Sequence, residues 1–427
     1  MSADREGHLS LNSKSELLAE ARRRMPEFKN LLCDLIRIPT DNPPGDTTEC
    51  FRYLKQLLES RGVKVSIHEP KVGNPNLVCQ LGSNERRHLV LNGHIDQFPV
   101  AMPQAWASPP YSGEIREHKI LGRGACDMKA GSTASLVCFM LAQEHGLAKN
   151  AKLTLTLVSD EETGGVWGAQ WLLEQFPDIA GTAAINGEPS GTDSIVIGHK
   201  GINWLKLRTF GKGGHGALAS AKDNAIEKML VLVEVVKGLQ GRRVTPPPGM
   251  DSHLQEAKKL LESNEDGKGL GWIVDSVSVS PGVISGGIKV NVIPQECEMS
   301  IDMRAPIGMT HAQLESEVLR LLTSAPVDRK DWTYDWELVT EPVYTEPDSE
   351  IVDLMSRNVA DVVGKKPVLR VVHWGADTRL WQYRGVPVAI YGPPSRSMGG
   401  SDEYVLEEDF EHVVLAHYAT TIDYLMA

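Results

Sequence analysis

Four short polar clusters in this chain combine acidic side chains with glycines, and one of them also contains a histidine. Each cluster borders an apolar run, and an α/β sheet collects the side chains of a functional site at the ends of its strands. The clusters lie at residues 92–96, 122–131, 159–165 and 186–190.

The first cluster places His94 and Asp96 two residues apart, directly after an apolar run. On an extended backbone these side chains point the same way. The imidazole can then bind a metal while the carboxylate fixes its tautomer. An isolated His-x-Asp pair is more often a solvent-facing turn, so this motif alone favours that simpler interpretation.

The other three clusters contribute carboxylates. Asp127 lies among glycines that let the backbone approach a ligand closely, but it can equally cap the helical run that follows. The three consecutive acids at 160–162 repel one another unless a cation neutralises them. One of these glutamates can bind metal while its neighbour faces water, and a solvated acidic loop is the alternative. For Glu188 the alternative is an ordinary turn.

As a set, the clusters indicate a metal site. One histidine and several carboxylates form a nitrogen and oxygen ligand set suited to Zn²⁺, Mn²⁺ or Co²⁺. Two such ions bridged by one carboxylate can activate water and polarise a carbonyl group for hydrolysis. A neighbouring glutamate can serve as general base and later as acid to a leaving amine. The set therefore predicts metal-dependent hydrolysis of an amide bond.

Apolar periodicity predicts the elements that must position these clusters. Strands are expected at 63–68, 76–81, 88–92, 152–159 and 183–187, and helices at 15–37, 47–61 and 131–145. From about residue 199 the order becomes β-α-β-β-α-β, with strands at 202–210, 275–279, 298–304 and 333–340 and helices near 224–239 and 310–324. We expect an α/β catalytic domain of residues 1–198 and 343–427, interrupted by an α+β domain of residues 199–342. Residues 245–269 should form a surface excursion.

Composition narrows the class of protein. The net charge of −12 and the pI near 5.6 argue against nucleic acid or an anionic membrane as a partner, because both attract basic surfaces. No stretch approaches the about 18 apolar residues of a membrane span, and residues 1–11 lack the apolar core of a signal peptide. The six cysteines show no Cys-x-x-Cys spacing and lie mostly in apolar runs, which favours free thiols and a cytoplasmic location.

Further motifs follow the four clusters in a recognisable order. They lie at residues 213–217, 290–294, 302–304 and 375–379. The complete series, spread over nearly the whole chain, resembles the M20 metallopeptidase family of deacetylases, desuccinylases and carboxypeptidases. The resemblance implies a zinc-peptidase-like catalytic domain, with a mixed sheet flanked by helices, and a ferredoxin-like lid or dimerisation domain inserted into it.

The resemblance also implies how metals would be held. His94, Asp127 and Glu188 would hold one ion, and Asp127 would bridge to a second ion held by Glu162. Asp96 would orient His94. The cofactor would be one or two Zn²⁺ ions, with Co²⁺ or Mn²⁺ as alternatives.

Catalytic and substrate-binding roles follow from the same resemblance. Glu161 would be the general base, and His215 would stabilise the oxyanion from the partner subunit of a homodimer. The substrate would be a small amide with a carboxylate. Its carbonyl or carboxylate would be bound by Asn291, Arg304, His373, Gly375, Asp377, Thr378 and Arg379.

One position departs from the family pattern. Family members carry a histidine four residues before the glutamate of the C-terminal motif, and here Gly399 precedes Glu403 at that spacing. Three protein ligands and water give the first metal about four ligands, which suits zinc, whereas the second metal keeps only about three. We therefore predict an asymmetric site whose second metal is weak or absent. His373, Ser401 or Asp402 could act as a substitute ligand, although a packing or substrate-contacting role fits His373 better.

Three functions remain open at this stage. The first is hydrolysis of small N-acyl amino acids or dipeptides. The second is a family derivative that forms an amide, or does other non-hydrolytic chemistry on small molecules, in the same cleft. The third is a non-catalytic binding protein. The intact set of candidate metal-binding and catalytic residues argues against it, because a binding protein does not need them.

Overall fold

A computed structural model describes residues 13–218, 223–263 and 267–427 of the chain. These residues form two compact units. The first runs to Ile197 and includes Thr345–Val368 and Ala376–Ala427, and the second comprises Gly198–Tyr344 and Leu369–Gly375. Leu369–Gly375 thus belongs to the second unit, whereas the sequence predicts that it lies in the catalytic domain. Residues 1–11, which we predict not to form a signal peptide, lie outside the described residues.

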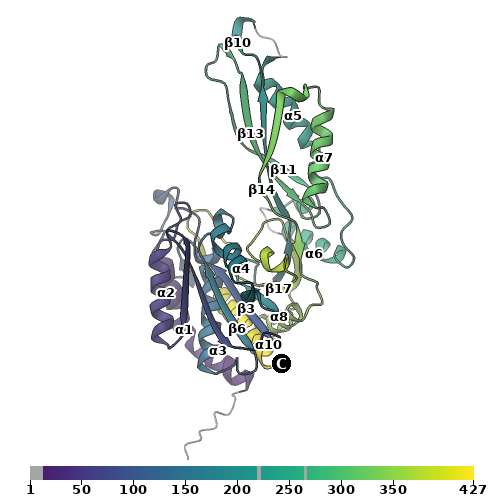
Figure 1. The fold of residues 1–427 in the computed structure, drawn as a ribbon. Coiled ribbons are helices and arrows are strands. Elements are labelled where there is room, and N and C mark those ends of the chain that lie inside the picture. Colours follow the sequence, from purple (N-terminus) through teal and green to yellow (C-terminus); the bar gives the residue numbers. More distant parts are fainter. Residues whose placement is uncertain (1–12, 219–222, 264–266) are drawn as a thin grey trace, which may run out of the picture. The chain divides into compact units, whose positions relative to one another are not determined.

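A mixed β-sheet forms the centre of the first unit (Figure 1). Seven of its nine strands follow the order β1-β2-β6-β3-β7-β17-β8. Strand β3 runs parallel to β6 and β7, and β7 runs parallel to β17, while β2 pairs antiparallel with β1 and β6. The strands are β1 Val65–Lys71, β2 Asn74–Gly82, β3 His88–His94, β6 Lys152–Val158, β7 Ala183–Asn186, β8 Ser194–His199 and β17 Val388–Ile390.

Helices flank this sheet. Helix α3 is buried along almost its whole length and packs on β3 and β6, and α10 packs on α3, α8 and α1. Helix α1 begins with a capping box, in which Ser13 and Glu16 satisfy each other's backbone N–H groups. The helices are α1 Lys14–Arg37, α2 Thr48–Ser60, α3 Ala130–Glu144, α4 Trp171–Gln175, α8 Glu350–Val363, α9 Arg379–Gln382 and α10 Glu407–Met426. The predicted fold class, a mixed sheet flanked by helices, is confirmed.

A small three-stranded sheet lies beside the functional region of the first unit. Strand β5 (Lys119–Leu121) pairs with β4 (Glu114–Arg116) and with β18 (Tyr404–Leu406). This pairing brings the chain just before β18 against the chain just after β5, and the Gly122 N–H donates to the Glu403 carbonyl at 2.9 Å. Two segments about 280 residues apart in sequence are joined in this way.

The second unit is an antiparallel sheet covered by helices. Its strand order is β11-β13-β9-β14, and the chain passes through it as β-α-β-β-α-β, the ferredoxin-like arrangement expected from the sequence. Alternate residues of β9 and β13 are buried against α5 and α7. The elements are β9 Gly201–Phe210, α5 Ala225–Lys237, β11 Ser278–Gly286, β13 Glu296–Ala305, α7 His311–Ser324 and β14 Trp332–Val339, with the short pair β10 Gly214–His215 and β12 Val292–Ile293.

One predicted surface excursion contains a helix. Within residues 245–269, α6 spans Asp251–Ser263 and buries Leu254 and Ala257. Five of its thirteen residues are charged, and the flanking segments are rich in proline and glycine, so the overall polarity of the segment indicates a loop although the helix has an apolar face. Residues 264–266 of the same segment lie outside the described part of the chain. None of the described helices is both long and apolar enough to cross a membrane.

Candidate metal centre

His94 is the last residue of β3 and is buried. Its Nδ1 lies 2.8 Å from the backbone carbonyl of Asp96. A carbonyl oxygen can only accept, so Nδ1 donates a proton to it, and Nε2 is the ring nitrogen that can face a cation. The sequence prediction gives this orienting role to the Asp96 carboxylate, but that group lies further away, at 3.4 Å.

Strand register explains why Glu188 lies close to His94. Strands β3 and β7 are parallel, with Asn92 opposite Asn186. Two residues further along each chain come His94 and Glu188. The Glu188 N–H donates to the Asn186 side chain at 2.8 Å, which holds the carboxylate at the end of the strand.

Asp127 reaches the same place from the segment between β5 and α3. Its backbone is extended, with φ −120° and ψ 103°. The Asp127 carboxylate makes no capping hydrogen bond at the start of α3. The backbone N–H groups of Cys126 and Asp127 instead donate to a Glu403 oxygen at 3.0 and 3.4 Å. Glu403 in turn pairs with Arg123 at 2.7 Å, and both side chains are almost fully buried. The alternative role of Asp127 as a helix cap is therefore not realised.

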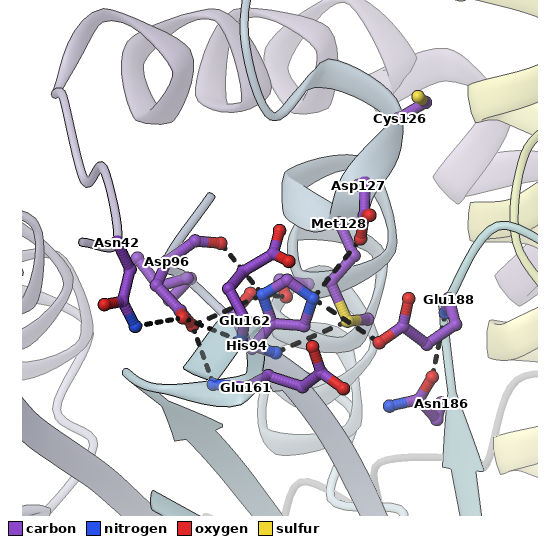
Figure 2. A network of polar contacts seen from close by, with 12 residues as sticks. Asn42, His94, Asp96, Cys126, Asp127, Met128, Glu161, Glu162, Asn186 and Glu188 are labelled. Atoms are coloured by element: carbon purple, nitrogen blue, oxygen red, sulfur yellow. Dashed lines mark hydrogen bonds and ion pairs between the residues drawn. The ribbon is translucent and has the colours of Figure 1, made fainter. Parts of the chain in front are cut away.

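The three side chains converge on one point (Figure 2). The His94 Nε2 atom lies 3.3 Å from Asp127 Oδ1 and 3.4 Å from Glu188 Oε1. Two donors bound tetrahedrally at about 2.0 Å from zinc lie about 3.3 Å apart. The buried Nε2 atom has no hydrogen-bond partner among the described residues, as expected of an atom that donates its lone pair to a cation. These residues fit a divalent metal ion.

Glu161 and Glu162 lie in the short helical turn η3 (Glu161–Thr163), which follows β6. Strand β6 is parallel to β3 with Val158 opposite His94, so the turn emerges beside the three converging side chains. The Glu162 Oε1 atom is buried and has no hydrogen-bond partner within the described residues. Glu162 does not belong to the tight three-donor group, which contains His94, Asp127 and Glu188.

Buried negative charge accumulates around this point. Burial, together with the Asp127 charge, raises the pKa of Glu188 to about 7 and that of Glu162 to about 11. Burial and the Glu188 charge raise the pKa of Glu161 well above its usual value. Burial opposes a charge on His94, but Glu188 and Asp127 hold its pKa well above the usual value. A divalent cation would compensate this excess of negative charge.

The remaining predicted residues of the first unit, Asp377, Thr378 and Arg379, are buried. Arg379 donates to the Ala376 and Gly164 carbonyls, and its guanidinium lies 3.5 Å from the Asp377 carboxylate. Thr378 immediately precedes α9 and is buried.

The second unit carries the other predicted residues. His215 is exposed on β10, and its Nδ1 accepts from the Ala217 N–H at 3.1 Å. Asn291 is an exposed residue before β12, and Gly375 closes the Leu369–Gly375 segment. Arg304 pairs with Asp302 at 2.8 Å.

Residues that sequence reasoning did not assign also belong to the first unit's site. Asn42 donates to the Asp96 carboxylate at 2.8 Å, and Arg123 pairs with Glu403 as described above. The only sequence signal for these residues was their position next to glycines, prolines or motif residues, which is too common to be diagnostic.

Comparison with known proteins agrees with this geometry. Residues 90–423 match the model of Peptidase family M20/M25/M40. This chain belongs to that family. It is 27% identical over 402 residues to the succinyl-diaminopimelate desuccinylase of Wolinella succinogenes, covering 91% of this chain and 98% of the relative.

Solved structures share the fold. An M20 family metallo-carboxypeptidase of Sulfolobus solfataricus superposes with a TM-score of 0.80 at 18% identity, over 94% of this chain and 100% of that one. A dinuclear metal-binding M20 peptidase of Bacillus subtilis gives a TM-score of 0.60 at 15% identity, over 94% and 98%. The predictions of the family, of its fold and of an enzyme are confirmed.

Gly399 lies where the family resemblance leads us to expect a histidine ligand. Its backbone is left-handed, with φ +70°, and its carbonyl accepts from Arg123 at 3.1 Å. Arg123 and Glu403 connect this carbonyl through hydrogen bonds to the Asp127 backbone. The nearby Asp402 carboxylate accepts the Ala107 N–H at 2.8 Å.

Proposed function

We propose that this enzyme hydrolyses amide bonds in small N-acyl amino acids or dipeptides with one tightly held metal ion and a weak or absent second ion. The observation that carries the proposal is the convergence of His94, Asp127 and Glu188, with donor separations of 3.3 and 3.4 Å. When bound there, a Zn²⁺, Co²⁺ or Mn²⁺ ion supplies a Lewis acid that polarises the substrate carbonyl.

Glu161 is the proposed general base. It lies in the turn next to the metal ligands, and the charges of Glu188 and His94 act on it. A base with a raised pKa can take a proton from the attacking water and pass it to the departing amine nitrogen. The Asp96 carboxylate accepts the backbone N–H groups of Glu161 and Glu162 and so attaches this turn to the segment that follows β3.

The proposed second ion has fewer ligands. Glu162 and the bridging Asp127 remain available, but Gly399 contributes no ligand atom. Two carboxylates and water leave a zinc ion about one ligand short of the usual four. This deficit is the reason for proposing an asymmetric site.

The proposed carboxylate-binding residues lie in the second unit. Burial, together with the cations Lys200, Arg370 and Arg304, lowers the pKa of His373 to about 4. Burial, and then Arg304, lowers the pKa of Lys200 to about 7. Such a concentration of basic groups in an acidic protein favours an anionic substrate group. Asn291 and the 375–378 loop would complete the binding of the substrate, and His215 would stabilise the oxyanion.

A homodimer through the second unit is part of the proposal. Strand β11 lies at the edge of its four-stranded sheet, and edge strands are templates for pairing with another chain. Several large apolar side chains on and after this strand are exposed, which is unusual for a surface that stays in water. They are Val283, Ile284, Ile288 and Val290. A cytoplasmic location is proposed as well, supported by six free, buried cysteines.

One observation favours a second function. Loss of the ligand at position 399 would suit an enzyme that forms an amide between two small molecules, because activated water is unwanted in that reaction. Metal analysis of the purified protein, together with an assay on a panel of N-acyl amino acids and dipeptides, separates the two functions. Hydrolysis that disappears on chelation and returns with zinc supports the proposal. One bound metal without hydrolysis favours the amide-forming reaction, and a protein that binds no metal refutes both.

A further inference from the structure

The turn that carries Glu161 and Glu162 ends in two consecutive glycines with left-handed backbone. Gly164 has φ +107° and Gly165 has φ +72°. Glycine has the widest conformational freedom of any residue, so such a turn does not hold one shape by itself. Catalytic groups need positions fixed to within about 0.5 Å. Contacts from outside the turn must therefore fix these two carboxylates.

The start of the turn is held by Asp96 and Asn42 (Figure 2). The Asp96 carboxylate accepts the Glu161 and Glu162 N–H groups at 3.2 and 3.1 Å. The Asn42 amide donates to the same carboxylate at 2.8 Å and to the Thr163 hydroxyl at 3.1 Å. All three residues of η3 are thus tied to the segment just after β3 or to the segment after α1.

The end of the turn is held by Arg379, at the start of α9. Its Nη2 donates to the Gly164 carbonyl at 2.7 Å, and its Nη1 donates to the Ala376 carbonyl at 2.8 Å. The arginine is only 6% exposed. Gly165 packs directly against Asp377, where an added Cβ would lie 2.2 Å from the carboxylate oxygen. No side chain other than hydrogen fits there.

Recognition of a carboxylate by arginine uses two parallel N–H groups of the guanidinium fork. Both terminal nitrogens of Arg379 already face backbone carbonyls of the first unit. Turning the fork toward a substrate would leave the Gly164 carbonyl without this partner and would release the turn. The family resemblance places Arg379 among the substrate-binding residues, but these contacts argue for a different role.

We propose that Arg379 is a positioning residue that holds the Glu161–Glu162 turn from its far end, while Asn42 holds it from the near end. Arg379 acts on the reaction through the turn and does not bind the substrate carboxylate. The kinetic part of this inference rests on the proposed hydrolase function; the structural part does not.

The test compares Arg379→Met and Asn42→Ala with Arg384→Met. Arg384 is a matched control because it is an exposed arginine just after α9 that donates to the Leu380 carbonyl, away from the turn. Hydrogen exchange followed by mass spectrometry reports the amides of residues 163–165, whose hydrogen bonds to Asp160 and Glu161 define the turn. Kinetics are measured on an N-acyl amino acid and on its carboxamide, which lacks the carboxylate.

Both turn variants should lose protection of these amides by about tenfold or more. They should also lower kcat by about 10- to 100-fold on the acid and the carboxamide alike, because misplacement of the base does not depend on the substrate's charge. The control should change neither quantity. If Arg379→Met fails to fold, Arg379→Lys keeps the charge but lacks the planar fork, and the same two measurements apply.

Unchanged protection of the turn in the Arg379 variant overturns the proposal. A rise in KM for the acid alone, with kcat and the carboxamide kinetics unaffected, overturns it as well and assigns Arg379 to the substrate. If no substrate is turned over by the wild-type enzyme, the proposed function has failed. The exchange measurement then still decides whether Arg379 and Asn42 hold the turn.

Discussion

Replacement of Gly399 by histidine should rebuild the second metal site. The carbonyl of Gly399 accepts from Arg123, and the Arg123–Glu403 pair contacts the Asp127 backbone, so residue 399 is connected through hydrogen bonds to a proposed metal ligand. An added Cβ would lie 3.7 Å from the Phe98 ring, an ordinary van der Waals distance. The substitution therefore meets no steric obstacle at its first atom.

The expected magnitude follows from ligand number and backbone strain. Zinc binding to complete four-ligand sites is worth about 10–16 kcal/mol, or about 3 kcal/mol per ligand. At about 1.4 kcal/mol for each tenfold change, one added imidazole should tighten the second ion roughly a hundredfold. The left-handed φ of +70° costs a residue with a Cβ about 1–2 kcal/mol of folding stability. This cost is present with and without metal, so it does not reduce the gain in affinity.

Isothermal titration with Zn²⁺ and elemental analysis after dialysis measure the outcome. Gly399→His should retain close to two ions per chain where the wild type retains about one. Gly399→Ala isolates the backbone strain, and Gly400→His places the same imidazole one residue away, where an added Cβ meets the Ser397 carbonyl at 3.3 Å. A folded Gly399→His protein whose zinc content and affinity equal those of Gly399→Ala would refute the asymmetric site.

Three further predictions concern the base, a buried ion pair and a buried histidine. Glu161→Gln should abolish turnover and leave the zinc content unchanged, so residual activity in a protein with normal zinc would exclude Glu161 as the base. Arg123→Met leaves the Glu403 carboxylate buried without its partner and should lower the free energy of unfolding by about 3–5 kcal/mol in chemical denaturation; a loss below 1 kcal/mol, by order of magnitude, would show that the pair is not needed. His417 is fully buried, its Nε2 donates to the Tyr391 carbonyl at 2.6 Å, and burial lowers its pKa to about 4. The unfolded chain protonates His417 near pH 6.5, whereas the folded chain does so only near pH 4. About 3 kcal/mol of folding stability that is present above pH 6.5 is therefore lost as the pH falls toward 4. Denaturation midpoints between pH 4 and 8 should show a shallower fall for His417→Gln, and an identical slope would contradict this assignment.

The elements of this protein follow largely from its sequence. Apolar periodicity predicts α1, α3, β3 and β6 to within a few residues, because a buried helix or strand repeats its apolar side chains locally. The order of motifs predicts the family and the inserted ferredoxin-like unit, which the comparisons and the strand order confirm. Helix α6 is missed because its segment is polar and highly charged, and this composition indicates a loop more strongly than its short apolar face indicates a helix.

Local spacing also identifies residue types suited to chemistry, but it does not decide what they contact. The spacing of His94 and Asp96 predicts a contact between their side chains, yet the backbone carbonyl is the closer partner and the carboxylate accepts the N–H groups of Glu161 and Glu162. Asp127 at a helix start looks like a cap, and only the Glu403 contacts to its backbone explain why its carboxylate turns to His94.

The tertiary structure alone decides the meeting of His94, Glu188 and Asp127 and the attachment of Arg379 to the Gly164 carbonyl. The first depends on the parallel register of β3 with β7 and on the pairing of β5 with β18, and both are hydrogen-bond patterns between distant segments. The second joins residues 215 positions apart. Sequence periodicity records which face of an element is buried, whereas partners across such distances are selected by packing and hydrogen bonding in the folded chain.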